Sequence, residues 1–379
     1  MDDSIPAAGR QPTALVVVSS ANQLYSGIGT VLFDWMRFAQ HAIEFRLLID
    51  TADFRNVGPA LRFCESTGIE LLLSAPNPTP GCPDHGVRDV ARIMGSRPWD
   101  LVECHSWANA ATNLDVLSSL RPGTRLIFTP YTQPIWTLPD WQQYFMVLPV
   151  FRRTLETADS TILLSPIELD DWDVDERIMR RALFIPGGVD TTTFSHADMP
   201  VTRNVLCVCD FAEPRKRVDL LFAAVATAAQ HDPGLRLTIA GSGSTTAQVP
   251  GGLRDRVTRL GYVSRERLVQ EYRTAGVLAL LSDYEAFGLP IAEALCCGAP
   301  VVINRQPQLE RIFVDLPGVS MVTNTKTAAV ADALLRRLDE PGDRRLIAAR
   351  AAERFALHAT YGRRLAHVLA LCGCGEAAA

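Results

Sequence analysis

The chain has 379 residues, a formal net charge of −5 at pH 7 and a hydrophobic fraction of 47%. This length predicts two domains, each able to bury a sizeable core. The acidic balance argues against a general nucleic-acid binder, because such proteins usually carry a basic face.

Signals for targeting and for a structural metal are absent from the sequence. Residues 1–12 are polar and lack the apolar core of a signal peptide, and no stretch of about 18 apolar residues predicts a membrane span. The nine cysteines include no C-x-x-C pair of the kind that holds zinc. We therefore expect buried, reduced cysteines and a cytoplasmic protein.

The first half of the chain alternates short apolar runs with helical stretches. The run at 14–18 is continuous and β-branched, which is typical of a parallel strand covered on both faces. Further strands are predicted at 45–49, 69–73, 101–104, 125–128 and 161–164, with helices such as 31–40 and 86–94 between them. This order predicts an α/β fold with right-handed crossovers.

The second half repeats the pattern after a Gly- and Pro-containing break at 185–200. Strands are predicted at 205–209, 235–240, 277–281 and 301–303, helices at 218–230 and 265–275, and one last helical stretch at 344–371. Two α/β domains in tandem form a cleft, and ligands of such sheets bind beyond the carboxyl ends of the strands.

The segment from Ser282 to Val302 carries the strongest chemical signal. The strand at 277–281 ends just before Ser282, and a helix is predicted to begin near Pro290, a residue favoured in a first turn. The amides of Gly288 and Leu289 then lack intrahelical partners and form a phosphate site. Glu285 precedes this site, and Glu293 is predicted on the first turn of the helix.

Glu285 and Glu293 match the E-x7-E signature of retaining glycosyltransferases of the GT-B fold, and the flanking Phe287, Gly288 and Pro290 also fit. The sequence resembles glycosyltransferase family 4, the glycosyl transferases group 1, over roughly residues 14–370. The resemblance implies two Rossmann-like domains whose parallel sheets face each other across a cleft. They span 1–188, for the acceptor, and 189–355, for the nucleotide sugar, with a C-terminal helix at about 356–372 packing back on the first.

A basic turn in the second half resembles the K-G-x-D-L-L motif of this family. Lys216 takes the position of the lysine that binds the donor diphosphate, and Arg217 replaces the glycine. The family's arginine about five residues earlier is missing, since Phe211 or Asp210 stands there, so Arg215 or Arg217 is expected to substitute. The implied catalytic residues are Glu285, Lys216 and Arg215. The alternative interpretation is a solvated basic turn.

Several other segments are assigned to the donor by the same resemblance. Gly241 ends a strand in a G-x-G turn, and Tyr262 and Val263 lie in the segment that lines the base. Gly27 and Gly29 resemble the N-terminal glycine loop, although the alternative of an ordinary strand–helix turn stays open. Phe287, Gly288, Leu289 and Glu293 complete the implied donor-binding set.

The sugar and acceptor pocket is assigned to His105 and Tyr131. His105 is the last residue of a stretch, beginning at Asp100, that resembles the family's D-[VI]-[VI]-x-x-H. A structural role for His105 is as well supported as a functional one. Tyr131 replaces a histidine that usually contacts the donor sugar in this family. The aromatic segment 133–145 suits either an acceptor pocket or ordinary packing.

The implied activity is retaining transfer of a hexosyl or HexNAc unit from a UDP- or GDP-linked donor to an acceptor hydroxyl, without cofactor or metal. No D-x-D spacing stands in a suitable strand context, since Asp171 to Asp173 falls in the first domain's predicted helical region. The acceptor is a glycan, a lipid or a small natural product, and peripheral membrane contact stays open. The alternatives are a catalytically inactive homologue and an NDP-sugar epimerase on the same fold.

Overall fold

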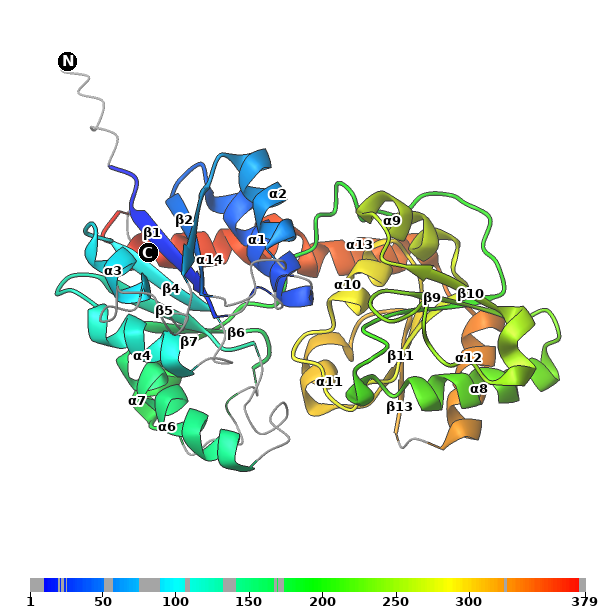
Figure 1. Ribbon diagram of the computed structural model, residues 1–379. Helices are drawn as coiled ribbons and strands as arrows, with labels where there is room; N and C mark the ends of the chain where they lie inside the picture. The colour runs from blue at the N-terminus through cyan, green and yellow to red at the C-terminus, as the bar shows by residue number, and fades with distance from the viewer. Residues whose placement is uncertain are drawn as a thin grey trace, which may run out of the picture. The chain divides into compact units, whose positions relative to one another are not determined.

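The computed structural model divides into two compact units, shown in Figure 1. Unit 1 comprises residues 1–164, 168–185 and 361–379, and unit 2 comprises 165–167 and 186–360. The structure describes residues 10–19, 21, 24, 26–50, 57–74, 89–105, 110–131, 141–166, 169, 174–323 and 326–374, without the side chains of 141–146. Each unit contains one parallel sheet, so the predicted α/β class is confirmed.

The sheet of unit 1 has seven strands in the order β3-β2-β1-β4-β5-β6-β7. Its strands are β1 (Thr13–Val18), β2 (Glu44–Asp50), β3 (Glu70–Ser74), β4 (Leu101–His105), β5 (Arg125–Thr129), β6 (Ser160–Leu163) and β7 (Ala182–Phe184). Every residue of β1, an interior strand of this sheet, is buried, as its β-branched sequence predicts.

Helices cover both faces of this sheet. The described helices are α1 (Gly27–Ala39), α2 (Gly58–Thr67), α3 (Asp89–Gly95), α4 (Ala110–Ser119), α6 (Trp141–Thr157) and α7 (Glu176–Met179). On one face, Leu15 and Val17 of β1 share a core with Val90 of α3 and Val116 of α4. On the other face, Trp35 of α1 donates a hydrogen bond to a β4 carboxylate at 3.0 Å.

The sheet of unit 2 has six strands in the order β10-β9-β8-β11-β12-β13. Its strands are β8 (Asn204–Val208), β9 (Arg236–Ala240), β10 (Val257–Gly261), β11 (Val277–Leu280), β12 (Val301–Asn304) and β13 (Val319–Val322). Its helices are η3 (Pro214–Lys216), α8 (Val218–His231), η4 (Gly251–Arg256), α9 (Arg265–Thr274), α10 (Leu289–Cys296), α11 (Pro307–Phe313), α12 (Thr327–Asp339) and α13 (Arg344–Phe355).

Three strands that the sequence does not predict, β7, β10 and β13, all lie at sheet edges. Most of their residues are half-buried or exposed. Because these three strands are incompletely covered and short, they do not give the long, continuous apolar run that marks a strand buried on both faces.

The last helical stretch is two helices rather than the single predicted one. Helix α13 ends at Phe355, Ala356 is extended with φ −53° and ψ 144°, and α14 (Leu357–Leu371) follows. The break forms because Ala356 bridges to Val189, whose amide donates to the carbonyl of Phe355 at 2.7 Å.

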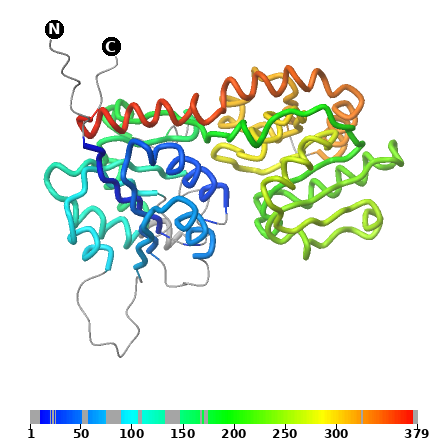
Figure 2. The backbone as a smooth tube through the Cα atoms, turned by 90° about the horizontal axis from the view of Figure 1, so that it is seen from above, coloured from blue at the N-terminus to red at the C-terminus, as the bar shows by residue number. Residues whose placement is uncertain are grey.

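From Tyr361 onward, α14 belongs to unit 1, and Figure 2 shows this red helix beside the blue start of the chain. The hydroxyl of Tyr361 donates to the carbonyl of Val31 on α1 at 3.0 Å. The prediction that the C-terminal helix packs on the N-terminal domain is therefore confirmed.

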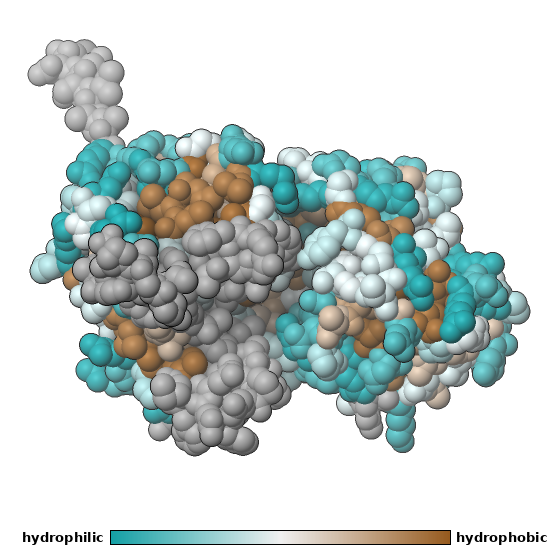
Figure 3. All heavy atoms as spheres, viewed as in Figure 1, coloured by the Kyte–Doolittle hydropathy of each residue, from teal (hydrophilic) through white to brown (hydrophobic). Residues whose placement is uncertain are grey.

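Large apolar side chains are exposed at only scattered positions of the described surface. Figure 3 shows several separate brown areas among the teal and white residues of one face, and the exposed large apolar residues include Leu61 and Leu73, at 43% and 37%. Isolated exposures of this kind are normal for folded proteins. Among the described residues, no helix combines the length and hydropathy needed to cross a bilayer.

Candidate functional site

The turn between β11 and α10 folds around Glu285, a residue that is only 8% exposed as a whole. The Ser282 hydroxyl donates to Glu285 Oε1 at 2.6 Å, and the backbone amide of Glu285 donates to Gln306 Oε1 at 2.8 Å. Gln306 Nε2 in turn donates to the Ser282 carbonyl at 2.5 Å. Glu285 is thus held by Ser282, at the start of its own turn, and by Gln306, from the segment after β12.

Lys216 at the end of η3 completes this arrangement. Its Nζ lies 2.5 Å from Glu285 Oε1, and the two side chains are 13% and 11% exposed. Burial by itself would raise the pKa of Glu285, but the Lys216 ammonium and the hydrogen bonds from Lys216 and Ser282 bring that pKa below its ordinary value. At neutral pH the site therefore holds a carboxylate beside an ammonium group.

The N-terminus of α10 lies directly after this pair in the chain. Gly288 is the N-cap with φ 79° and ψ 54°, a left-handed conformation that glycine adopts without strain. An added Cβ at Gly288 would lie 2.6 Å from Cδ1 of Ile291. The first amides of a helix have no intrahelical acceptor and carry partial positive charge, so Gly288 and Leu289 form a suitable place for phosphate.

The two arginines that flank Lys216 hold the basic turn against the β11–α10 turn. Arg215 Nη1 donates to the carbonyl of Tyr284 at 3.1 Å, and Arg217 Nη1 pairs with Asp283 Oδ1 at 3.0 Å. Arg217 has φ 50°, so it occupies a left-handed position where glycine is favoured. This backbone conformation agrees with the glycine expected there from the K-G-x-D-L-L pattern.

Glu293 is the fifth residue of α10, so it lies on the second turn rather than on the first as expected. Its side chain is buried, at 6% exposure, and Oε2 accepts a hydrogen bond from the hydroxyl of Tyr272 on α9 at 2.9 Å. Burial and the neighbouring Glu293 carboxylate raise the pKa of Tyr272, which therefore stays protonated as the donor. Tyr272 is a partner of Glu293 that the sequence pattern does not reveal.

The remaining predicted donor residues of unit 2 gather at the carboxyl ends of β9 and β10. Gly241 has φ 115°, and an added Cβ would lie 2.2 Å from the carbonyl oxygen of Cys209. The Gly241 amide donates to the carbonyl of Gly261 at 2.8 Å, which ties the two strand ends together. Tyr262 follows directly and is 64% exposed, and Val263 is the next residue.

In unit 1, the predicted glycine loop is the start of α1. Gly27 is the first helical residue, and the Ser26 hydroxyl caps the helix by accepting from the amide of Ile28 at 3.2 Å. An added Cβ on Gly29 would lie 2.3 Å from the carbonyl oxygen of Leu24, whereas Gly27 has open space around it. Gly29 is therefore required by close backbone packing, and Gly27 is the more accessible of the two.

His105 and Tyr131 form one buried unit. His105 is 0% exposed, its Nδ1 lies 2.8 Å from the Tyr131 hydroxyl, and its Nε2 lies 3.1 Å from Glu103 Oε2. Burial lowers the pKa of His105, and the carboxylate of Glu103 opposes this only in part, so the ring is neutral at pH 7. Because a carboxylate only accepts, Nε2 carries the proton and Tyr131 donates to Nδ1.

Glu103 is the centre of this network, and the sequence pattern does not single it out. Besides His105, it accepts from Trp35 Nε1 at 3.0 Å and pairs with Arg364 Nη2 of α14 at 2.7 Å. Burial tends to raise the pKa of Glu103, but Arg364 and the His105 hydrogen bond lower it below its ordinary value. Arg364 is separated from Glu103 by 261 residues, and no local signal connects them.

With this geometry established, comparison with known proteins identifies the family. The model of the family "Glycosyl transferases group 1" matches residues 202–340. A D-inositol 3-phosphate glycosyltransferase of Actinosynnema mirum is 31% identical over 285 residues, which cover 67% of each chain. The chain belongs to the glycosyl transferases group 1 family.

Other members of this family match a smaller share of their own length. The D-inositol 3-phosphate glycosyltransferase of Mycobacteroides abscessus is 30% identical over 62% of this chain and 58% of its own. In two further relatives, the match covers 45% and 54% of the relative's own length. The chain therefore spans about half the length of these relatives.

The fold of the chain also matches a solved structure, that of Anabaena Alr3699/HepE in complex with UDP-glucose. It matches with a TM-score of 0.74 and 16% identity, over 95% of this chain and 99% of that one. The likeness is one of fold, and it confirms the predicted GT-B fold.

Two of the predicted segments lie outside the residues that the structure describes. They are the aromatic acceptor segment 133–140, with the side chains that continue it to 145, and the D-x-D spacing at 171–173. Across the residues that the structure describes, no three His, Cys, Asp or Glu side chains are grouped so that they could hold a metal ion.

A surface hollow in unit 2 contains none of the predicted site residues. It has a volume of about 710 Å³ and lies between α13 and the segment that follows α11. Its charged side chains pair with one another, since Arg354 contacts Asp315 at 2.6 and 2.7 Å and Arg350 contacts Glu353 at 2.9 Å. The hollow therefore offers no unpaired charge to a ligand.

Proposed function

We propose that this protein is a retaining glycosyltransferase that transfers a hexosyl or HexNAc unit from a nucleoside-diphosphate sugar to an acceptor hydroxyl. The observation that carries the proposal is the Lys216–Glu285 pair, with its 2.5 Å contact, next to the helix N-terminus at Gly288. An ammonium group and helix amides suit a diphosphate, and a carboxylate suits sugar hydroxyls.

In the proposed mechanism, unit 2 binds the donor. The diphosphate lies against the amides of Gly288 and Leu289 and near Lys216, which stabilise the negative charge that grows on the leaving oxygen. Arg215 and Arg217 hold Lys216 in place through their contacts with the β11–α10 turn. Glu285 accepts hydrogen bonds from the transferred sugar and orients it.

The transfer step itself needs no base from the protein. The bond between the anomeric carbon and the phosphate oxygen breaks while the acceptor oxygen bonds to the same face of the sugar. The departing phosphate oxygen takes the acceptor's proton, so charge and atoms balance. The positive groups around the diphosphate lower the barrier because they are already in place when the charge develops.

Relatives and structural neighbours support a nucleotide-sugar donor. The relatives are named as glycosyltransferases, and Alr3699/HepE was crystallised with UDP-glucose. We therefore place UDP-linked sugars first among the candidate donors and GDP-linked sugars second.

Substitution of the ion pair tests this function. Lys216→Met and Glu285→Gln should each lower sugar transfer from UDP-glucose, or its slow hydrolysis, by about 100-fold or more, as expected when one charge-stabilising group is lost. The matched control is Lys326→Met, which removes the chain's other lysine at an exposed position of unit 2. Nucleotide release measured by chromatography gives the rates, and wild-type rates for both site variants would refute the assignment.

The same experiment separates the alternative functions. A UDP-dependent rise in melting temperature without transfer or hydrolysis would indicate an inactive homologue, because a ligand stabilises the state that binds it. Recovery of an epimerised sugar without acceptor would indicate an epimerase. No thermal shift with UDP, GDP or ADP would contradict the nucleotide site altogether.

A further inference from the structure

Two cysteines stand two residues apart where β8 ends. Cys207 is the fourth residue of β8 and is 3% exposed, whereas Cys209 lies just beyond the last strand residue, Val208, and is half-buried. Residues two apart on a strand point to the same face, so both thiols face one side of the unit 2 sheet. Their Sγ atoms lie 3.8 Å apart, within reach of a weak hydrogen bond between thiols.

This thiol pair lies close to the proposed donor site of unit 2. The hydrogen bond with Cys209 and burial raise the pKa of Cys207 well above its ordinary value, so Cys207 is a thiol at neutral pH. The charges of Lys216, which lowers this pKa, and of Glu285, which raises it, have weaker effects. Such effects fall off with distance, so both charges lie near the Cys207 sulfur.

The backbone of Cys209 is packed tightly against the turn that follows β9. Its amide donates to the carbonyl of Ala240 at 3.2 Å, and a Cβ added to Gly241 would lie 2.2 Å from its carbonyl oxygen. From Cys209 the chain runs through residues 210–215 directly to Lys216. The position of Cys209 therefore sets where the segment that carries Lys216 begins.

A disulfide bond between these two thiols would displace this backbone. In an extended strand the Cα atoms of residues two apart are separated by about 6.4–6.8 Å, whereas a disulfide allows at most about 6.8 Å. The sulfur atoms must also approach from 3.8 Å to about 2.0 Å. Cys207 is fixed in the strand ladder opposite Ile239, so Cys209 is the residue that moves, out of its contact with Gly241.

We propose that Cys207 and Cys209 form a redox-sensitive pair, and that a peroxide converts them to a disulfide that weakens donor binding by displacing the basic turn around Lys216. The effect on the donor rests on the proposed function, whereas the oxidation does not. The half-buried Cys209 is the thiol that a dissolved oxidant reaches first, and the buried Cys207 is the thiol that closes the bond.

The oxidation balances with hydrogen peroxide as the oxidant. The Cys209 sulfur attacks one peroxide oxygen, the O–O bond breaks, and Cys209 becomes a sulfenic acid while the other oxygen leaves as water. The Cys207 sulfur then attacks the Cys209 sulfur, and the second oxygen leaves as water with the proton of the Cys207 thiol. The two thiols lose two electrons and the peroxide is reduced. A disulfide closed across an extended backbone is strained, so dissolved thiols reduce it readily.

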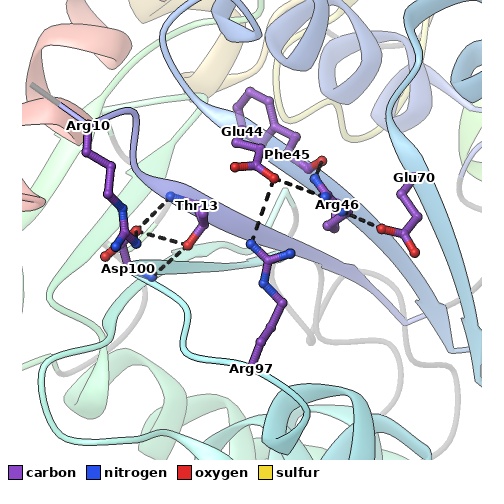
Figure 4. Close-up of polar contacts among 8 residues, drawn as sticks. All are labelled: Arg10, Thr13, Glu44, Phe45, Arg46, Glu70, Arg97 and Asp100. Atoms are coloured by element: carbon purple, nitrogen blue, oxygen red, sulfur yellow. Dashed lines mark hydrogen bonds and ion pairs between the residues drawn. The ribbon is translucent and has the colours of Figure 1, made fainter. Parts of the chain in front are cut away.

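The other C-x-C spacing in the chain, Cys372 to Cys374, provides a matched comparison. The Cys374 thiol donates to the carbonyls of Arg10 and Cys372 at 3.8 and 3.5 Å. Arg10 pairs with Asp100 at 2.9 Å, and Asp100 also accepts from the Thr13 amide, as Figure 4 shows. None of these unit 1 residues belongs to the proposed donor site of unit 2, so a change at Cys374 should leave that site unaffected.

Mass spectrometry of the full-length protein tests the oxidation. After treatment with hydrogen peroxide, free thiols are alkylated and trypsin releases peptide 204–215, whose only cysteines are Cys207 and Cys209. This peptide should lose two hydrogens and take up no alkyl group, and dithiothreitol should restore both thiols. Full alkylation after peroxide, or a gain of oxygen in place of the lost hydrogens, would overturn the proposal.

Nucleotide binding tests the consequence for the donor site. In calorimetry, oxidised wild type should bind UDP about 10-fold or more weakly than reduced wild type, as expected when one charged contact is lost. Cys209→Ser should bind UDP like the reduced wild type before and after peroxide, whereas Cys374→Ser should keep the full response. Equal UDP affinity of the reduced protein and of the protein with the disulfide would contradict the inferred effect.

These outcomes are distinct from a failure of the proposed function. If the reduced protein binds none of UDP, GDP and ADP, the proposed function fails, and hydrogen exchange of residues 210–217 then measures the displacement without a ligand. Exchange there should be faster after oxidation, and unchanged exchange would refute the inference. Melting temperatures identify a variant that does not fold, and Cys209→Ala takes the place of Cys209→Ser in that case.

Discussion

At the scale of single residues, the sequence pattern predicts the buried charged side chains least well. Glu103 is completely buried and is surrounded by Trp35, His105 and Arg364, three residues from three different elements. A buried carboxylate is tolerated only with such partners, because water no longer solvates it. The sequence suggests His105 but gives no sign of Glu103 or Arg364.

Removal of Arg364 should therefore destabilise the protein strongly. Arg364→Met leaves the Glu103 carboxylate buried beside His105 without its cation, and breaking such a pair costs about 3–5 kcal/mol. Chemical unfolding of unit 1 measures this loss. The double variant Glu103→Gln/Arg364→Met should recover a substantial part of it, and equal stability of the single variant and wild type would contradict the role of the pair.

At the scale of elements, the β11–α10 turn shows how local sequence positions chemical groups. The strand ends, Gly288 takes a left-handed conformation, and Pro290 enters the first turn of α10. This order places Glu285 three residues before the N-cap Gly288 and the opening amides of the helix. The turn was predictable because each step is a local property of the residues that form it.

Gly288→Ala tests this turn. The left-handed backbone costs a residue with a Cβ about 1–2 kcal/mol, and the added methyl would crowd Ile291 at 2.6 Å. We expect a comparable loss of stability in unit 2 and weaker binding of UDP, measured by unfolding and by calorimetry. Gly251→Ala is the control, since a Cβ there meets no atom within 4 Å. Unchanged UDP affinity in Gly288→Ala would argue against a phosphate at this helix terminus.

At the scale of the whole molecule, the end of the chain completes the unit formed by its beginning. The segment from residue 361 belongs to unit 1, where Tyr361 bonds to Val31 and the Arg364 guanidinium lies 4.3 Å from the Trp35 ring centre. Unit 2 contains the remainder of the C-terminal half. A change at the last helix should therefore affect the first unit more than the second.

A chain ending at Thr360 should lose the stability of unit 1 and keep the nucleotide response of unit 2. Hydrogen exchange should show faster exchange for the amides of β1 and β4, while UDP still slows exchange in α10. Full protection of β1 and β4 in the shortened chain would show that α14 is dispensable for unit 1.

The sequence by itself determined the two α/β units, the buried strands and the turn with Glu285, Gly288 and Pro290. Each of these follows from a local pattern: an apolar run, a glycine at a left-handed position or the spacing of residues along one helix. Tertiary structure alone decided the edge strands β7, β10 and β13, the pairing of Arg364 with Glu103 and the Tyr272 partner of Glu293. Each of these joins residues far apart in the chain, and only folding sets which distant side chains share a buried volume.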